Sequence, residues 1–142
     1  MNRRTLNEAP GTRPTRRFVF VLLEEFTLLS FAGAVDALRL ANRFLGYDAY
    51  TWAIAGDGGE HVTCSSGCTV ALDMDLAELR HSDTVVVCAG VRVGQHTTRR
   101  LVSWLRREAR RGVTMGAFCT GAHALAEAGL LDGKRATIHW EN

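Results

Sequence analysis

Long apolar runs are absent from this sequence, and that absence excludes a membrane-spanning protein. No run approaches the roughly 20 apolar residues that a transmembrane helix requires. The first run, residues 18–23, is short and is followed by two glutamates, so it does not have the form of a signal peptide. We therefore expect a cytoplasmic protein that makes no contact with a membrane.

Proline is also scarce, and both prolines lie within the first 14 residues. Residues 1–17 hold five arginines against one glutamate and show no apolar periodicity, so we expect a disordered basic tail, with a phosphate-binding arm as the alternative. The other residues carry 12 basic and 14 acidic side chains, so the folded body has no basic footprint for nucleic acid. The arginines within 99–111 are typical of the solvated face of an amphipathic helix.

Metal-binding motifs are missing, although the chain has four cysteines and five histidines. Cys64 and Cys68 have three residues between them, and no second Cys or His pair lies at the spacing of a zinc site. We therefore expect no metal and no cofactor. A reducing cytoplasm argues against structural disulfides, and Cys88 lies in an apolar run as a small buried side chain. Cys119 remains as the candidate for chemistry.

Strand and helix patterns alternate along the chain and predict its fold. Apolar runs rich in strand formers occupy residues 18–23, 50–55, 84–90 and 113–118, and residues 62–72 have the pattern of a hairpin. Helical patterns occupy residues 31–44, 73–79, 97–111 and 121–128. This order indicates a three-layer, doubly wound α/β fold with a mostly parallel sheet. Ligands of such sheets bind at the carboxyl ends of the strands, where three segments fall: Glu24-Glu25-Phe26, Gly90-Val91 and Cys119-Thr120.

Cys119 stands between a predicted strand and a helix of small residues, which is the layout of a nucleophile elbow. The cramped turn requires small residues two positions before and after the cysteine, and Ala117 and Gly121 meet that requirement. The amino end of the helix would favour the thiolate. The backbone N–H of Thr120 would form half of an anion site, and the backbone at Gly90-Val91 would form the other half. A buried cysteine at a strand end with no special role is the alternative.

The sequence around this elbow resembles a known family. The segments that carry the resemblance are Cys119-Thr120-Gly121, residues 125–133 and residues 136–141, with agreement at 22–28 and 34–42. They are similar to the N-terminal domain of GlxA-like, AraC-type transcriptional regulators of the class I glutamine amidotransferase-like (ThiJ/PfpI) superfamily. Within that family the likeness is closest to activators of quaternary-amine (glycine betaine, carnitine) catabolism.

The resemblance covers residues 18–142 and implies a flavodoxin-like ligand-sensing domain. It also implies a small-molecule effector, a homodimer, and contact with DNA only through a helix-turn-helix domain that this chain does not contain. Because the family fold has further sheet and helix elements after the histidine that matches His139, we expect the domain to be incomplete at its C-terminal end.

Hydrolases of the superfamily pair the elbow cysteine with a histidine and an acidic residue, and the resemblance transfers these positions only in part. His139 matches the histidine, whereas the acidic position falls on Ser30. Thr120 replaces the histidine that follows the cysteine in peptidase-like members, and Gly90-Val91 replaces Gly-Gly. We therefore expect a site that binds rather than turns over its ligand. A ThiJ/PfpI-type cysteine hydrolase using Cys119 and His139 is the alternative, because one base can activate a thiol.

A quaternary amine would be bound by aromatic faces and carboxylates. Local candidates for these groups are Phe26, Trp140, Glu25 and Glu141. A plain dimerisation module that binds no ligand is a third possibility. The complete set of expected ligand contacts is Glu25, Phe26, Ser30, Gly90, Val91, Cys119, Thr120, His139 and Trp140.

Overall fold

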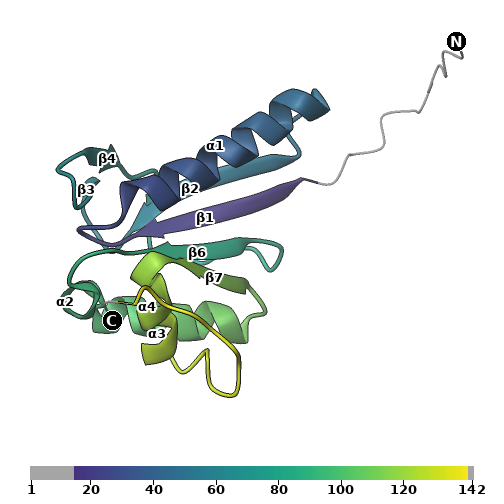
Figure 1. Ribbon diagram of the computed structural model, residues 1–142. Coiled ribbons are helices and arrows are strands. Elements are labelled where there is room, and N and C mark those ends of the chain that lie inside the picture. Colours follow the sequence, from purple (N-terminus) through teal and green to yellow (C-terminus); the bar gives the residue numbers. More distant parts are fainter. Residues whose placement is uncertain (1–14, 141–142) are drawn as a thin grey trace, which may run out of the picture.

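The computed structural model describes residues 15–140 (Figure 1). Within these residues, five parallel strands form one sheet in the order β5-β2-β1-β6-β7. Their bounds are β1 (Arg16–Leu22), β2 (Tyr50–Gly56), β5 (Met74–Asp75), β6 (Thr84–Cys88) and β7 (Thr114–Phe118). The predicted hairpin is confirmed as an antiparallel pair, β3 (His61–Thr63) and β4 (Thr69–Ala71).

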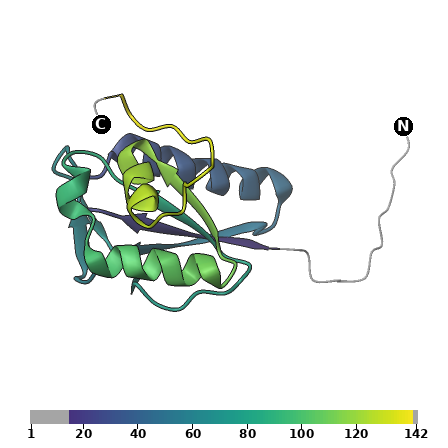
Figure 2. The same ribbon diagram turned by 90° about the horizontal axis from the view of Figure 1, so that it is seen from below.

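Helices cover both faces of the sheet, as expected for a three-layer α/β fold (Figure 2). One face packs against α1 (Leu28–Leu45) and the hairpin. The other packs against α3 (Arg99–Arg110) and α4 (Ala122–Glu127), with the single-turn α2 (Val93–His96) at the carboxyl end of the sheet. The mostly parallel sheet with flanking helices confirms the predicted flavodoxin-like class.

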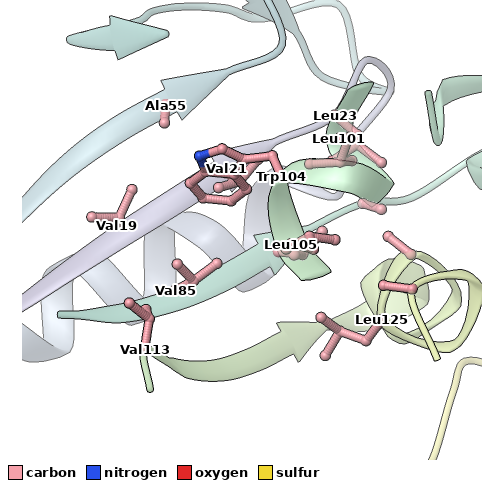
Figure 3. Packing of buried hydrophobic residues seen from close by; sticks show 14 of the residues in the cluster. Val19, Val21, Leu23, Ala55, Val85, Leu101, Trp104, Leu105, Val113 and Leu125 are labelled. Carbon is pink, nitrogen blue, oxygen red and sulfur yellow. The ribbon is translucent and has the colours of Figure 1, made fainter. Parts of the chain in front are cut away.

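Strand β1 contributes to two separate cores because its side chains alternate between the faces of the sheet. Phe20 and Leu22 join the core under α1. Val19 and Val21 join the core under α3, which also contains Trp104 (Figure 3). Burial on both faces explains why the strand appears in the sequence as an unbroken apolar run.

The order of the strands places a topological switch beside β1. The chain passes from β1 to β2 on one side and later returns to β6 on the other side. Ligands in open α/β sheets bind at such a switch, beyond the carboxyl ends of the strands. The loops after β1, β6 and β7 therefore form the candidate site.

The predicted end of the basic tail is wrong. The basic tail was expected to extend to residue 17, but strand β1 begins at Arg16, and the Arg17 guanidinium lies 3.0 Å from the buried Asp83 carboxylate. That ion pair and the pairing with β2 hold the segment in the sheet. Residues 1–14 of the predicted tail lie outside the described residues.

The predicted helix over residues 73–79 is also wrong. Met74–Asp75 instead forms β5 at the edge of the sheet, beside Ala55 and Gly56 of β2. The Asp73 carboxylate accepts a hydrogen bond of 2.8 Å from the Ile54 N–H. Pairing with an open strand edge has thus overridden the helical pattern of a short segment. The other expected helices are present, and α1 begins three residues earlier than predicted.

Candidate functional site

Cys119 follows β7 directly and has a φ of +53°, in the left-handed region that non-glycine residues rarely adopt. It opens a single 3₁₀ turn, Cys119–Gly121, that leads into α4. The strand, strained cysteine and helix have the geometry of the predicted elbow.

The requirement for small residues around the elbow is also met in the structure. A Cβ atom on Gly121 would lie 2.3 Å from the Val87 carbonyl oxygen and 3.3 Å from the Ala117 Cβ. Any side chain at position 121 would therefore force the elbow away from β6.

The sulfur of Cys119 has a partner that the sequence did not reveal. The Thr27 hydroxyl donates a hydrogen bond to Cys119 Sγ over 3.4 Å. Ser30, expected at the acidic position, instead donates its hydroxyl to the Thr27 carbonyl oxygen at 2.9 Å. The group beside the sulfur from the first strand–helix turn is thus a neutral hydroxyl. Thr27 could have been suspected only because it lies in the turn between β1 and α1, directly before the helix.

The loop at Gly90 packs tightly against the loop after β1. A Cβ atom on Gly90 would lie 2.3 Å from the Glu25 carbonyl oxygen and 2.9 Å from the Thr27 nitrogen. The Val91 N–H donates to the Glu25 carbonyl oxygen at 3.1 Å, so this N–H already has a backbone partner, and the predicted anion site at the Gly90-Val91 backbone stays a prediction. The Thr120 hydroxyl donates to the Gly90 carbonyl oxygen at 2.7 Å, which joins the elbow to the same loop.

An open pocket of about 340 Å³ lies above the elbow. It brings together five of the predicted contacts, together with two residues that sequence reasoning missed, Thr27 and Arg92. The full lining is Thr27, Gly90, Val91, Arg92, Cys119, Thr120 and His139.

Arg92 is held at the pocket by a charged cluster. Its Nε donates to Glu25 Oε2 at 2.7 Å, its Nη2 donates to Glu25 Oε1, and His96 Nε2 lies 2.9 Å from Glu25 Oε2. The hydrogen bonds from Arg92 and then His96 lower the pKa of Glu25 to about 2. The Glu25 carboxylate is therefore ionised at neutral pH and is already engaged by two partners.

Backbone strain gathers at this site. Among the described residues, the non-glycine positions with positive φ are Glu25 (60°), Arg92 (51°) and Cys119 (53°). They follow β1, β6 and β7 respectively, so each of the three loops contributes one. Such conformations cost about 1–3 kcal/mol each and cluster at functional sites.

The two aromatic candidates do not line the pocket. The Phe26 ring is fully buried and packs edge-on against Phe31 with centroids 5.7 Å apart, so it offers no face to a ligand. This corrects the expected contact. Trp140 is 83% exposed and lies beside His139, with ring centroids 5.8 Å apart. Glu141 lies outside the described residues.

Residues 15–140 contain neither a cluster of metal-binding side chains nor a helix that could span a membrane. No group of three or more His, Cys, Asp or Glu side chains in this range could hold a metal ion. No helix in the same range is both long and apolar enough to cross a membrane.

This chain has a flavodoxin-like sheet, and a pocket at the topological switch point contains the cysteine of a strand–turn–helix elbow. Together these features place it in a class of α/β domains with an elbow cysteine. The sequence profile of the DJ-1/PfpI family matches residues 16–142. The chain belongs to the DJ-1/PfpI family.

Relatives in this family include transcriptional regulators. The HTH-type transcriptional regulator GbdR of Pseudomonas aeruginosa is 42% identical over 137 residues, which cover 94% of this chain and 37% of GbdR. The HTH-type transcriptional regulator CdhR of the same species is 46% identical over 124 residues, covering 87% of this chain and 37% of CdhR. The chain thus spans little more than a third of the length of these regulators.

A solved structure of a transcriptional regulator is also similar to this chain. The crystal structure of an AraC family transcriptional regulator from Pseudomonas putida superposes with a TM-score of 0.73 at 31% identity. The match covers 89% of this chain and 68% of that one. AraC-like regulators that carry a DJ-1/PfpI domain are therefore homologues of this chain.

Proposed function

We propose that this chain is the metabolite-sensing part of an AraC-type transcriptional regulator. Its effector, a small amine or amino-acid-like molecule, binds in the pocket above Cys119. The relatives support this role, because regulators align with nearly the whole chain. The proposal extends to DNA contact through a helix-turn-helix domain outside this chain and to a homodimer.

The observation that carries the proposal is the partner of Cys119 Sγ. A hydrolase of this design needs a group near the sulfur that can accept its proton. From the turn after β1, where hydrolases of the superfamily supply an acidic residue, the group that contacts the sulfur is the Thr27 hydroxyl, which donates to it at 3.4 Å and is not a base. The pocket is therefore better suited to bind a ligand than to turn one over.

A cysteine hydrolase is the second candidate, because His139 lines the same pocket as Cys119. His139 would act as the base, and the elbow would keep the sulfur exposed. Such an enzyme forms a covalent adduct at Cys119 during turnover.

Binding is tested by thermal shift on the complete protein with glycine betaine, dimethylglycine, carnitine and arginine. A ligand at 100 times its dissociation constant stabilises the folded state by about 2.7 kcal/mol, which raises the melting temperature by several degrees. Absence of any shift with all four compounds contradicts the proposed effector class.

Catalysis is tested by mass spectrometry after incubation with the same compounds. A covalent mass or a turned-over product that disappears in Cys119→Ser and persists in Cys68→Ser supports the hydrolase instead. Cys68 is the matched control, because it is an exposed thiol on the β3–β4 hairpin, outside the pocket lining.

A further inference from the structure

The described residues that line the pocket above Cys119 include a permanent positive charge and no negative charge. Among its described lining residues, Arg92 is the side chain with a permanent charge, and no carboxylate belongs to the lining. The Glu25 carboxylate, in the loop after β1, is engaged by Arg92 and His96. An anionic group on a ligand is therefore favoured over a cationic one at this point of the pocket.

Arg92 is also fixed in place before any ligand arrives. Its backbone is in the left-handed region, and Glu25 holds the Nε and Nη2 side of its guanidinium. An arginine side chain loses rotamer entropy when it is immobilised, and the ion pair with Glu25 restrains the Arg92 side chain before a ligand binds. Binding of a ligand to Arg92 therefore causes little further loss of side-chain entropy.

The remaining donors of Arg92 have the geometry that a carboxylate needs. A guanidinium carries five N–H donors, and the Glu25 contact uses one on Nε and one on Nη2. The end formed by Nη1 and Nη2 therefore keeps two parallel donors for a second carboxylate. The Arg92 side chain is 57% exposed, so this end can be reached from solvent.

We propose that Arg92 binds a carboxylate of the effector, and that Glu25 acts as a positioning residue for Arg92. The inference rests on the proposed function, since it concerns the same pocket, and it narrows the effector class to small carboxylic acids. Betaines and amino acids satisfy this requirement, whereas simple amines and amino alcohols do not.

One test does not depend on knowing the effector. Iodoacetate and iodoacetamide both alkylate a cysteine thiolate with loss of iodide, and they differ in that iodoacetate carries a carboxylate. The rate ratio of iodoacetate to iodoacetamide is measured at Cys119 and, as an internal reference, at Cys68, by peptide mass spectrometry on the complete protein. We expect a ratio several-fold higher at Cys119 than at Cys68, because Arg92 draws the charged reagent into the pocket.

Variants assign this selectivity to Arg92. Arg92→Gln lowers the ratio at Cys119 to that of Cys68, and Arg92→Lys, which keeps the charge but not the paired donors, retains part of it. Arg100→Gln is the matched control and leaves the ratio unchanged. Arg100 is 51% exposed and is paired with two carboxylates, Asp57 and Asp75, away from the pocket lining. Equal ratios at the two cysteines, or a ratio that survives Arg92→Gln, overturn the proposal.

Matched ligand pairs separate this inference from the proposed function. Titration calorimetry compares glycine betaine with choline and arginine with agmatine, which lack the carboxylate. For a carboxylate ligand that binds, Arg92→Gln weakens binding about tenfold to a hundredfold. If the dissociation constant is the same for wild type and Arg92→Gln, or the same for ligands with and without the carboxylate, the inference is overturned. The proposed sensing role is unaffected by that result. Iodoacetate selectivity without any effector binding supports Arg92 and counts against the proposed function.

Discussion

Replacing Gly90 by alanine tests whether the loops after β1 and β6 form a single packed unit. A Cβ atom at this position would lie 2.3 Å from the Glu25 carbonyl oxygen, 2.9 Å from the Thr27 nitrogen and 3.0 Å from the Phe26 carbonyl carbon. All three atoms belong to the backbone, so no side-chain rotation relieves the contact. The two loops must separate.

The loss of stability in Gly90→Ala can be compared with that of other substitutions that add atoms to a tightly packed region. Extra methyl groups in a tightly packed region typically destabilise a protein by about 1–3 kcal/mol. Separating the loops would also weaken the 3.1 Å hydrogen bond from Val91 N–H to the Glu25 carbonyl oxygen. We therefore expect Gly90→Ala to lower the free energy of unfolding by about 1–3 kcal/mol.

The matched control is Gly33→Ala in the exposed part of α1, where nothing lies within 4 Å of the added Cβ. Alanine is a better helix former than glycine, so this variant should be more stable by about 0.5–1 kcal/mol. Urea unfolding followed by circular dichroism measures both changes. A Gly90→Ala protein at least as stable as the wild type would refute the close packing of the loops.

Three further predictions concern ionisable groups. Glu108 is fully buried and is held by Arg107 and Arg111; we expect Glu108→Ala to cost about 2–3 kcal/mol in urea unfolding, and a neutral result would contradict that anchoring role. Because the folded-state pKa of Glu25 is lowered from 4.5 to about 2, its stabilisation is complete above pH 4.5 and is lost as the pH falls toward 2. The melting-temperature difference between wild type and Glu25→Gln should therefore shrink below pH 4.5, and a difference that grows there would refute the assignment. Burial raises the pKa of Cys88 to about 12, so this thiol should resist iodoacetamide at pH 8 in the native protein and react in urea; labelling in native buffer would show that its strand opens.

Local patterns in the sequence were sufficient for the fold class and the elbow. The apolar runs predicted four strands of the sheet, because a parallel strand covered on both faces is mostly apolar along its length. The elbow at Cys119 was predictable because its small flanking residues, Ala117 and Gly121, lie within five positions of the chain, although the closest contact that requires Gly121 comes from Val87 on β6. Segments whose state depends on a distant partner were mispredicted, as at Met74–Asp75, where the edge of β2 provides the pairing.

The sequence by itself therefore determined the α/β fold class, four of the five strands of the sheet, the position of the strained cysteine and the membership of the DJ-1/PfpI family. Only the tertiary structure decided that Thr27, and not Ser30, contacts the sulfur, and that Glu25 holds Arg92 at the pocket. The physical reason is the distance along the chain. Each of these contacts joins loops that are 67 or 92 residues apart, and their side chains meet only because parallel strands bring their carboxyl ends to one edge of the sheet.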